Sequence, residues 1–91
     1  MKKDNVKKLH FVGVGGVGMG SLAEALSNAG FTISGSDNAL YDPMKSVLAK
    51  AQVQFLEGYK AEHCKAIDPD GVVIGNVVRK ENEEAKAWIQ S

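Results

Sequence analysis

The chain has 91 residues, enough for one small domain with a hydrophobic core. Lysine plus arginine and aspartate plus glutamate both number 11, and this zero net charge argues against a nucleic-acid-binding protein. The single cysteine, Cys64, excludes an internal disulfide and a cysteine-based zinc site. We expect neither a signal peptide nor a membrane span, because glycines interrupt the first apolar run, and these features favour a cytoplasmic protein.

The pattern predicts a basic, solvated leader over residues 1–8 and one domain over residues 9–91. The domain begins with a buried strand over Leu9–Val14, which ends in glycines, and an amphipathic helix follows at once. We interpret His10, inside this strand, as a structural residue. The apolar face of the helix comprises Met19, Leu22, Ala23, Leu26 and Ala29, and Gly30 is placed to end it.

Three glycines between the strand and the helix have the spacing G-x-G-x-x-G: Gly13, Gly15 and Gly18. In this context the spacing is typical of a loop whose helix N-terminus faces a diphosphate. The first glycine allows a sharp turn, the second a close approach to an anion, and the third close packing of helix and strand. The motif therefore predicts a nucleotide or a nucleotide-linked ligand, and the alternative is a packing turn without one.

A second strand is predicted over Phe31–Gly35 and leads into Ser36 and Asp37, nineteen positions after Gly18. In dinucleotide enzymes an acid at this place accepts hydrogen bonds from ribose hydroxyls, although a plain loop role is the alternative for Asp37. These residues indicate a ribose and a diphosphate, a description that NAD, FAD and a UDP-sugar all satisfy.

The rest of the chain continues to alternate helices and strands. A helix follows Asp42-Pro43, and a last helix has Asn82 as its cap. The other predicted elements are a strand over Val53–Leu56, a short helix over Ala61–Ile67 and a strand over Val72–Ile74. His63 is predicted to be solvated, and the buried face of the last helix is predicted to comprise Ala85, Trp88 and Ile89.

This alternation predicts a parallel sheet with right-handed crossovers, that is, a Rossmann-like doubly wound fold of three α/β/α layers. The architecture normally adds another strand after such a last helix, because an open sheet edge is a liability. We therefore expect a fragment, the N-terminal domain of a longer protein.

Two segments, His10–Met19 and Ile33–Asp37, closely resemble the N-terminal domain of the muramate ligases, which build bacterial peptidoglycan precursors. The glycine motif is most similar to the branch that adds L-alanine to UDP-N-acetylmuramate. Three other stretches resemble the branch that adds a recycled tripeptide: Tyr41–Met44, Glu57–Tyr59 and Ile74–Asn76. That branch often carries a cysteine and a threonine in the glycine loop, which this chain lacks, so the amino acid or peptide that is joined stays open.

The resemblance implies that this domain holds the UDP part of UDP-N-acetylmuramate. The residues expected at the diphosphate are Gly13, Gly15, Gly16, Val17, Gly18 and Met19. Those expected at the uridine and ribose are Ser36, Asp37 and Asn76. Tyr59 is interpreted as a surface or core aromatic residue, with a cover over the base as the alternative.

The family reaction activates a carboxylate with ATP and Mg²⁺ as an acyl phosphate, and it requires a P-loop that this chain lacks. The resemblance places ATP and Mg²⁺ in a central domain and the peptide in a C-terminal one. We expect no catalytic residue and no metal ligand here, and we expect UDP-N-acetylmuramate and those domains as partners. The alternatives are the NAD-binding half of an oxidoreductase and a stand-alone nucleotide-sensing domain.

Overall fold

A computed structural model describes residues 7–75, 78–79 and 81–90, and of Val17 only the backbone. The predicted alternation is confirmed, with slightly different bounds. The elements are β1 (Lys8–Val12), α1 (Val17–Asn28), β2 (Thr32–Asp37), α2 (Met44–Lys50), β3 (Gln54–Glu57), α3 (His63–Ala66), β4 (Gly71–Ile74) and α4 (Glu83–Gln90). Among the described residues, no helix combines the length and the apolarity that a membrane span requires.

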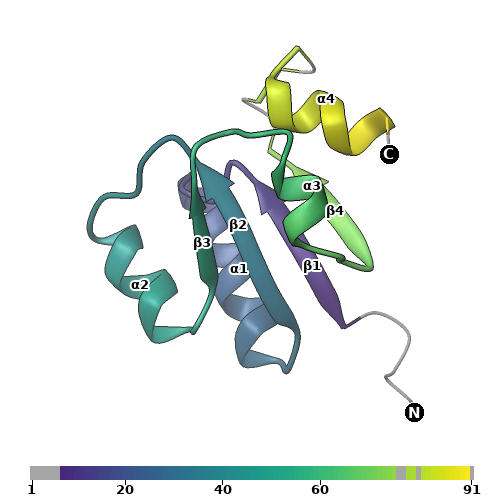
Figure 1. Cartoon of the computed structure of the whole chain (residues 1–91). Coiled ribbons are helices and arrows are strands. Elements are labelled where there is room, and N and C mark those ends of the chain that lie inside the picture. Colours follow the sequence, from purple (N-terminus) through teal and green to yellow (C-terminus); the bar gives the residue numbers. More distant parts are fainter. Residues whose placement is uncertain (1–6, 76–77, 80, 91) are drawn as a thin grey trace.

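The strands form one parallel sheet in the order β3-β2-β1-β4. Helices α1 and α2 cover one face, and α3 lies on the other with α4 beside it (Figure 1). The predicted Rossmann-like, three-layer fold is confirmed. The chain runs outward from β1 to β3 and then crosses back to β4, so β1 and β4 flank the point where the strand order reverses. In open parallel sheets, ligands bind at such a point, outside the carboxyl ends of the strands.

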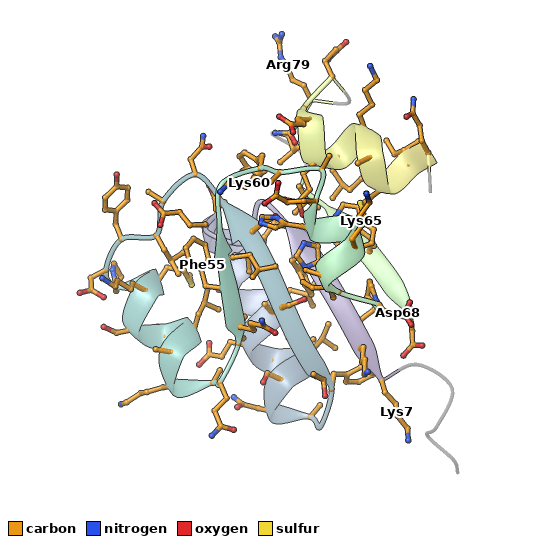
Figure 2. The ribbon with its side chains drawn as sticks, in the orientation of Figure 1. Lys7, Phe55, Lys60, Lys65, Asp68 and Arg79 are labelled. Carbon is orange, nitrogen blue, oxygen red and sulfur yellow. The ribbon has the colours of Figure 1, made fainter. Side chains whose placement is uncertain are left out.

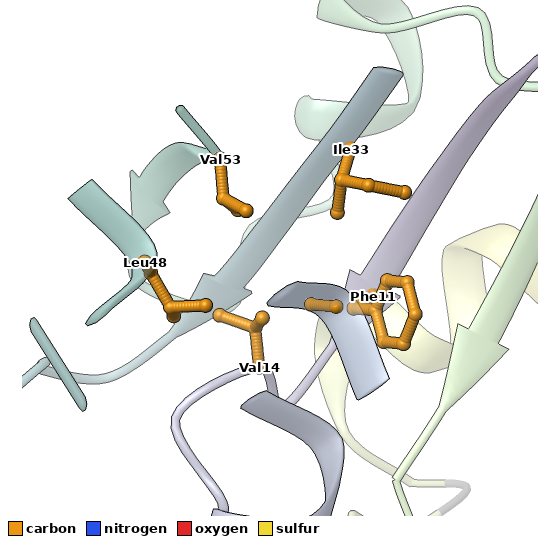
Figure 3. Close-up of a cluster of buried hydrophobic side chains, with 6 residues drawn as sticks. Phe11, Val14, Ile33, Leu48 and Val53 are labelled. Carbon is orange, nitrogen blue, oxygen red and sulfur yellow. The ribbon is translucent and has the colours of Figure 1, made fainter. Parts of the chain in front are cut away.

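The face beneath α1 and α2 carries the hydrophobic core. Its buried side chains are Phe11, Val14, Ala23, Ile33, Leu48 and Val53 (Figure 3). Val14 belongs to the glycine loop and not to a strand, yet it is fully buried. It lies over Gly35, where an added Cβ atom would be 2.5 Å from the Cβ of Val14. The loop is therefore anchored in the core, and the missing side chain at position 35 makes room for it.

The opposite face of the sheet carries several buried polar side chains. His10, Ser34 and Ser36 point toward this side from adjacent strands, and Glu84 and His63 cover them. The prediction that His63 is solvated is wrong, because the side chain is only 7% exposed and hydrogen-bonds to Glu84. The interpretation of His10 as an interior residue agrees with its full burial.

Two predicted helix faces are also corrected. Ile89 is 62% exposed, because the covered side of α4 is centred on Glu84 and Trp88, a quarter turn away. Leu22 is 45% exposed, because α1 turns Met19, Ala23 and Leu26 toward the core instead. Both helices therefore present narrower apolar stripes to the protein than the periodicity predicts.

Candidate functional site

The loop between β1 and α1 is fixed to the end of β2. The N–H groups of Gly13 and Val14 donate to the carbonyl oxygen of Ser36 at 2.8 and 3.1 Å. Gly13 has a φ of 92°, a conformation that side chains disfavour, and this turn ends β1 at Val12 and not at Val14 as predicted. The motif thus builds a rigid connection whose first residues bond to the neighbouring strand.

The amides at the start of α1 have no partner within the helix. Gly16 is the N-cap without a side-chain hydrogen bond, and the helical bonds begin with the N–H of Gly20, which donates to the Gly16 carbonyl at 2.6 Å. The N–H groups of Val17, Gly18 and Met19 therefore remain for a ligand, at the positive end of the helix dipole. Such a helix start suits the oxygens of a phosphate group.

The expected packing role of Gly18 is wrong. This residue is exposed, and a Cβ atom added to it would meet no described residue outside its own helix within 4 Å. The glycines that permit close packing are Gly20, where a Cβ would overlap the sulfur of Met44, and Gly35, which faces Val14. The third motif position therefore leaves the helix start open to solvent, and packing depends on glycines outside the motif.

Asp37 connects the glycine loop with two other segments. Its Oδ2 accepts the N–H of Gly15 at 2.8 Å. Its Oδ1 accepts the N–H of Asn38 at 2.8 Å and the hydroxyl of Tyr59 at 3.2 Å. A carboxylate has about four acceptor sites, so one remains for a ligand hydroxyl. The Gly15 amide is committed to Asp37 in this conformation, unlike the open amides of residues 17–19.

The hydroxyl of Tyr59 is a hydrogen-bond donor to Asp37 at every physiological pH. Burial, together with the charge of Asp37 and the hydrogen bond to it, raises the pKa of the Tyr59 phenol to about 12. The hydroxyl therefore stays protonated over the whole physiological range and keeps donating to the carboxylate. No sequence pattern separates this role from that of an ordinary aromatic residue, because the contact joins positions 22 residues apart.

The other two residues expected at the uridine and ribose differ in placement. The side chain of Ser36 is fully buried on the polar face of the sheet, with its Oγ 3.5 Å from Nε2 of His10. Ser36 contacts the glycine loop through its carbonyl oxygen, so its hydroxyl does not point toward the loop. Asn76 lies outside the described residues. The preceding Gly75 donates its N–H to the Val12 carbonyl at 2.9 Å, at the start of the glycine turn.

A cavity of about 470 Å³ opens beside these groups, within the size range of small-molecule sites, about 300–1,000 Å³. Three segments line it: the glycine loop, the stretch from the last residue of β2 to the first residue of α2, and Tyr59, two residues after β3. The lining residues are Gly13, Gly15, Gly16, Asp37, Ala39, Tyr41, Asp42, Pro43, Met44 and Tyr59. Backbone groups of the glycine loop, the two carboxylates of Asp37 and Asp42, and two tyrosine rings thus surround one cavity at the carboxyl ends of the strands.

Residues 8–90 match the family model described as "Mur ligase family, catalytic domain". A UDP-N-acetylmuramate–L-alanine ligase from Neisseria gonorrhoeae is 42% identical over 90 residues, which are 99% of this chain and 19% of that protein. The chain thus spans about a fifth of the length of this curated relative.

Two solved structures are similar as well. The UDP-N-acetylmuramate:L-alanyl-γ-D-glutamyl-meso-diaminopimelate ligase of Neisseria meningitidis superposes with a TM-score of 0.86 at 34% identity, covering 93% of this chain and 26% of that one. The UDP-N-acetylmuramate–alanine ligase of Thermotoga maritima gives 0.76 at 30% identity, covering 91% and 19%.

Proposed function

The chain belongs to the Mur ligase family, and from this premise we propose that it is the N-terminal domain that binds the UDP part of UDP-N-acetylmuramate. The observation that carries the proposal is a helix start with free amides that directly follows a glycine loop, and this loop lines one cavity together with the carboxylate of Asp37. The amides of Val17, Gly18 and Met19 face a diphosphate, and Gly13, Gly15 and Gly16 shape the loop that presents them.

Asp37 supplies the acceptor on the nucleoside side of the proposed site. Its one unused acceptor position fits a ribose hydroxyl, and its negative charge disfavours a phosphate there. Ser36 contributes its carbonyl oxygen, which accepts the N–H groups of Gly13 and Val14 and so positions the glycine loop. Asn76 follows the end of β4, next to β1, and we include it on the uridine side.

The chemistry of the whole protein is part of the same proposal. An ATP-dependent ligase that forms an acyl phosphate requires a nucleotide loop and Mg²⁺ ligands, and these 91 residues contain neither Gly-Lys-Ser nor Gly-Lys-Thr. In the described part of the chain, no three His, Cys, Asp or Glu side chains are grouped to hold a metal ion. ATP and Mg²⁺ therefore do not fit this site, and we assign them to the central domain of a three-domain cytoplasmic enzyme of peptidoglycan synthesis or recycling.

The alternative of an NAD-binding half of an oxidoreductase is not favoured, because the similarities lie with the Mur ligases throughout. Relatives that join L-alanine and relatives that join a tripeptide both resemble the chain. The residues that choose between these two substrates are assigned to the C-terminal domain.

An NMR titration of the ¹⁵N-labelled chain tests the proposed ligand. We expect UDP-N-acetylmuramate to shift the amide resonances of Gly18, Met19 and Asp37, because the first two bond to phosphate and the third to ribose. NAD, added separately, is expected to leave them in place. Shifts with NAD alone would contradict the proposal in favour of a dinucleotide site, and the absence of shifts with both would contradict binding by this chain.

Replacing Asp37 with alanine is expected to weaken the binding of UDP-N-acetylmuramate at least about tenfold, because a charge-assisted hydrogen bond to the ribose is lost. The matched control is Asp70→Ala. Asp70 also accepts backbone N–H groups, from Lys7 and Lys8 at 2.9 Å, but at the opposite end of β1. Isothermal titration calorimetry compares the two variants, and equal losses of affinity would argue against a role of Asp37 in the site.

A further inference from the structure

Glu84 is a fully buried carboxylate with hydrogen-bond donors on both oxygens. Its Oε2 lies 2.7 Å from Nε2 of His10 and 2.9 Å from Nε1 of Trp88. Its Oε1 lies 2.6 Å from Nδ1 of His63 and 3.2 Å from the backbone N of Lys60. An ionised carboxylate only accepts, so each of these nitrogen atoms carries a hydrogen directed at Glu84.

These contacts join three regions that are distant in the chain, around positions 10, 60–63 and 84. Glu84 belongs to α4, His10 to β1, His63 to α3, and Lys60 to the connection that follows β3. A buried charge is costly unless it is fully hydrogen-bonded, and here no buried side-chain polar atom of the described residues lacks a partner. A carboxylate held in this way restricts the position of every group that donates to it.

Two of the four donors are connected to the candidate site through further hydrogen bonds. The first is Lys60, which directly follows Tyr59. The Tyr59 hydroxyl donates to Asp37, and Asp37 also accepts the N–H of Gly15. Figure 2 shows Lys60 near the carboxyl ends of β2 and β3, on the side where α3 and α4 lie.

The second connection starts at His10. Nε2 of His10 lies 3.5 Å from Oγ of Ser36, and the carbonyl of Ser36 holds the N–H groups of Gly13 and Val14. The other ring nitrogen of His10 contacts Oγ of Ser34 at 2.8 Å. Two residues of β2 hold the glycine loop, Ser36 and Asp37. Ser36 lies beside His10, which bonds to Glu84, and Asp37 bonds to Tyr59, whose next residue in the chain also bonds to Glu84.

We propose that Glu84 is a positioning residue for the nucleotide site, which acts through Lys60–Tyr59 and through His10–Ser36 to preform the glycine loop and Asp37 before a ligand arrives. The proposal deepens the proposed function and rests on it for its effect on affinity. Its effect on the loop is measurable without any ligand. The site would therefore depend on a residue of α4 that lies outside the cavity.

The test compares Glu84→Gln, Tyr59→Phe and the double variant in the ligand-free chain by NMR. Glutamine keeps the shape of the side chain but cannot accept from all four donors. We expect Glu84→Gln to shift the Gly15 amide resonance and to speed its hydrogen exchange, as Tyr59→Phe does. Ile89→Ala is the matched control on the same helix, because this side chain is 62% exposed, and it is expected to leave Gly15 unchanged.

The second readout is the affinity of the same variants for UDP. Each single change is expected to weaken binding about fivefold, and the double variant by less than the product of the two, because both changes act on the connection through Lys60 and Tyr59. An unchanged Gly15 resonance in Glu84→Gln, or fold-changes that multiply in the double variant, would overturn the proposal. Failure of the wild-type chain to bind UDP would contradict the proposed function alone, since the Gly15 measurement stands without a ligand.

If Glu84→Gln does not fold, His63→Phe replaces it in both measurements. Phenylalanine keeps a ring but has no hydrogen-bond donor, so this change removes a donor from Oε1, the oxygen that also accepts from Lys60. A shifted Gly15 amide is expected in this variant too, and an unshifted one would overturn the proposal.

Discussion

Replacing Glu84 with alanine is expected to lower the free energy of unfolding by about 4 kcal/mol, as for other buried pairs that lose one partner. The change leaves the ring N–H groups of His10 and His63 and the indole N–H of Trp88 without their acceptor. Domains of this size are stable by only about 5–15 kcal/mol, so much of the total is lost. Urea unfolding at neutral pH, followed by circular dichroism, measures the difference.

The matched control on the same helix is Ile89→Ala. Ile89 is 62% exposed, and exposed substitutions change stability by about 0.5 kcal/mol or less. A loss in Glu84→Ala no larger than in Ile89→Ala would show that the buried carboxylate does not hold α4 to the sheet.

The same carboxylate is expected to make stability depend on pH in the acid range. Burial raises the pKa of Glu84, but hydrogen bonds from His10, Trp88, His63 and Ser36 outweigh it and lower the pKa from 4.5 to about 2. A carboxyl group with a depressed pKa in the folded state stabilises the fold fully above its unfolded pKa. This contribution is lost as the pH falls through the folded pKa.

The free energy of unfolding of the wild-type chain should therefore fall more steeply between about pH 4.5 and pH 2 than that of Glu84→Gln. Other carboxyl groups titrate in both proteins, so the difference between the two curves isolates Glu84. Parallel curves would contradict the depressed pKa.

Gly35→Ala is expected to cost about 3 kcal/mol of stability, because an added methyl group overpacks the core. The new Cβ atom would lie 2.5 Å from Cβ of Val14 and 2.7 Å from its Cγ1, so the side chain or the glycine loop must move. For a domain of this size the melting temperature should fall by about 10–20 °C. Thermal unfolding measures the shift, and the Gly13 and Gly15 amide resonances report the displacement of the loop.

Gly18→Ala is the matched control for this change. A Cβ atom at position 18 meets no described residue beyond its own helix within 4 Å, and alanine is the better helix former, so stability should be unchanged or slightly higher. A loss in Gly35→Ala no larger than in Gly18→Ala would contradict the anchoring of Val14 beneath β2.

The elements that the sequence predicts well are those whose cause is local. Strand and helix follow from the period of apolar residues, and the cap of α4 follows from one side chain, since Oδ1 of Asn82 accepts the N–H groups of Glu84 and Ala85. The turn at Gly13 and the free amides at the start of α1 are also local consequences of glycine and of helix geometry. The fold class and the glycine loop were therefore predictable from neighbouring residues.

What periodicity could not predict are contacts across the sheet. Glu84 resembles an ordinary acidic residue of a first helical turn, yet its partner His10 is 74 positions away, and His63 was predicted to be solvated. A signal did exist, because His10, Ser34 and Ser36 are polar positions inside buried strands and require a polar cover.

Which residue supplies that cover depends on how α3 and α4 pack against the sheet, a choice made by long-range packing and not by neighbours in the chain. The same holds for Asp37. Its carboxylate and its place after the second strand predicted a ligand, but its hydrogen bonds with Gly15 and Tyr59 form only because three loops come together at one edge of the sheet. Local propensity thus decided the elements and the loop. The burial of charge, whose cost depends on everything packed around it, was decided by the assembled fold.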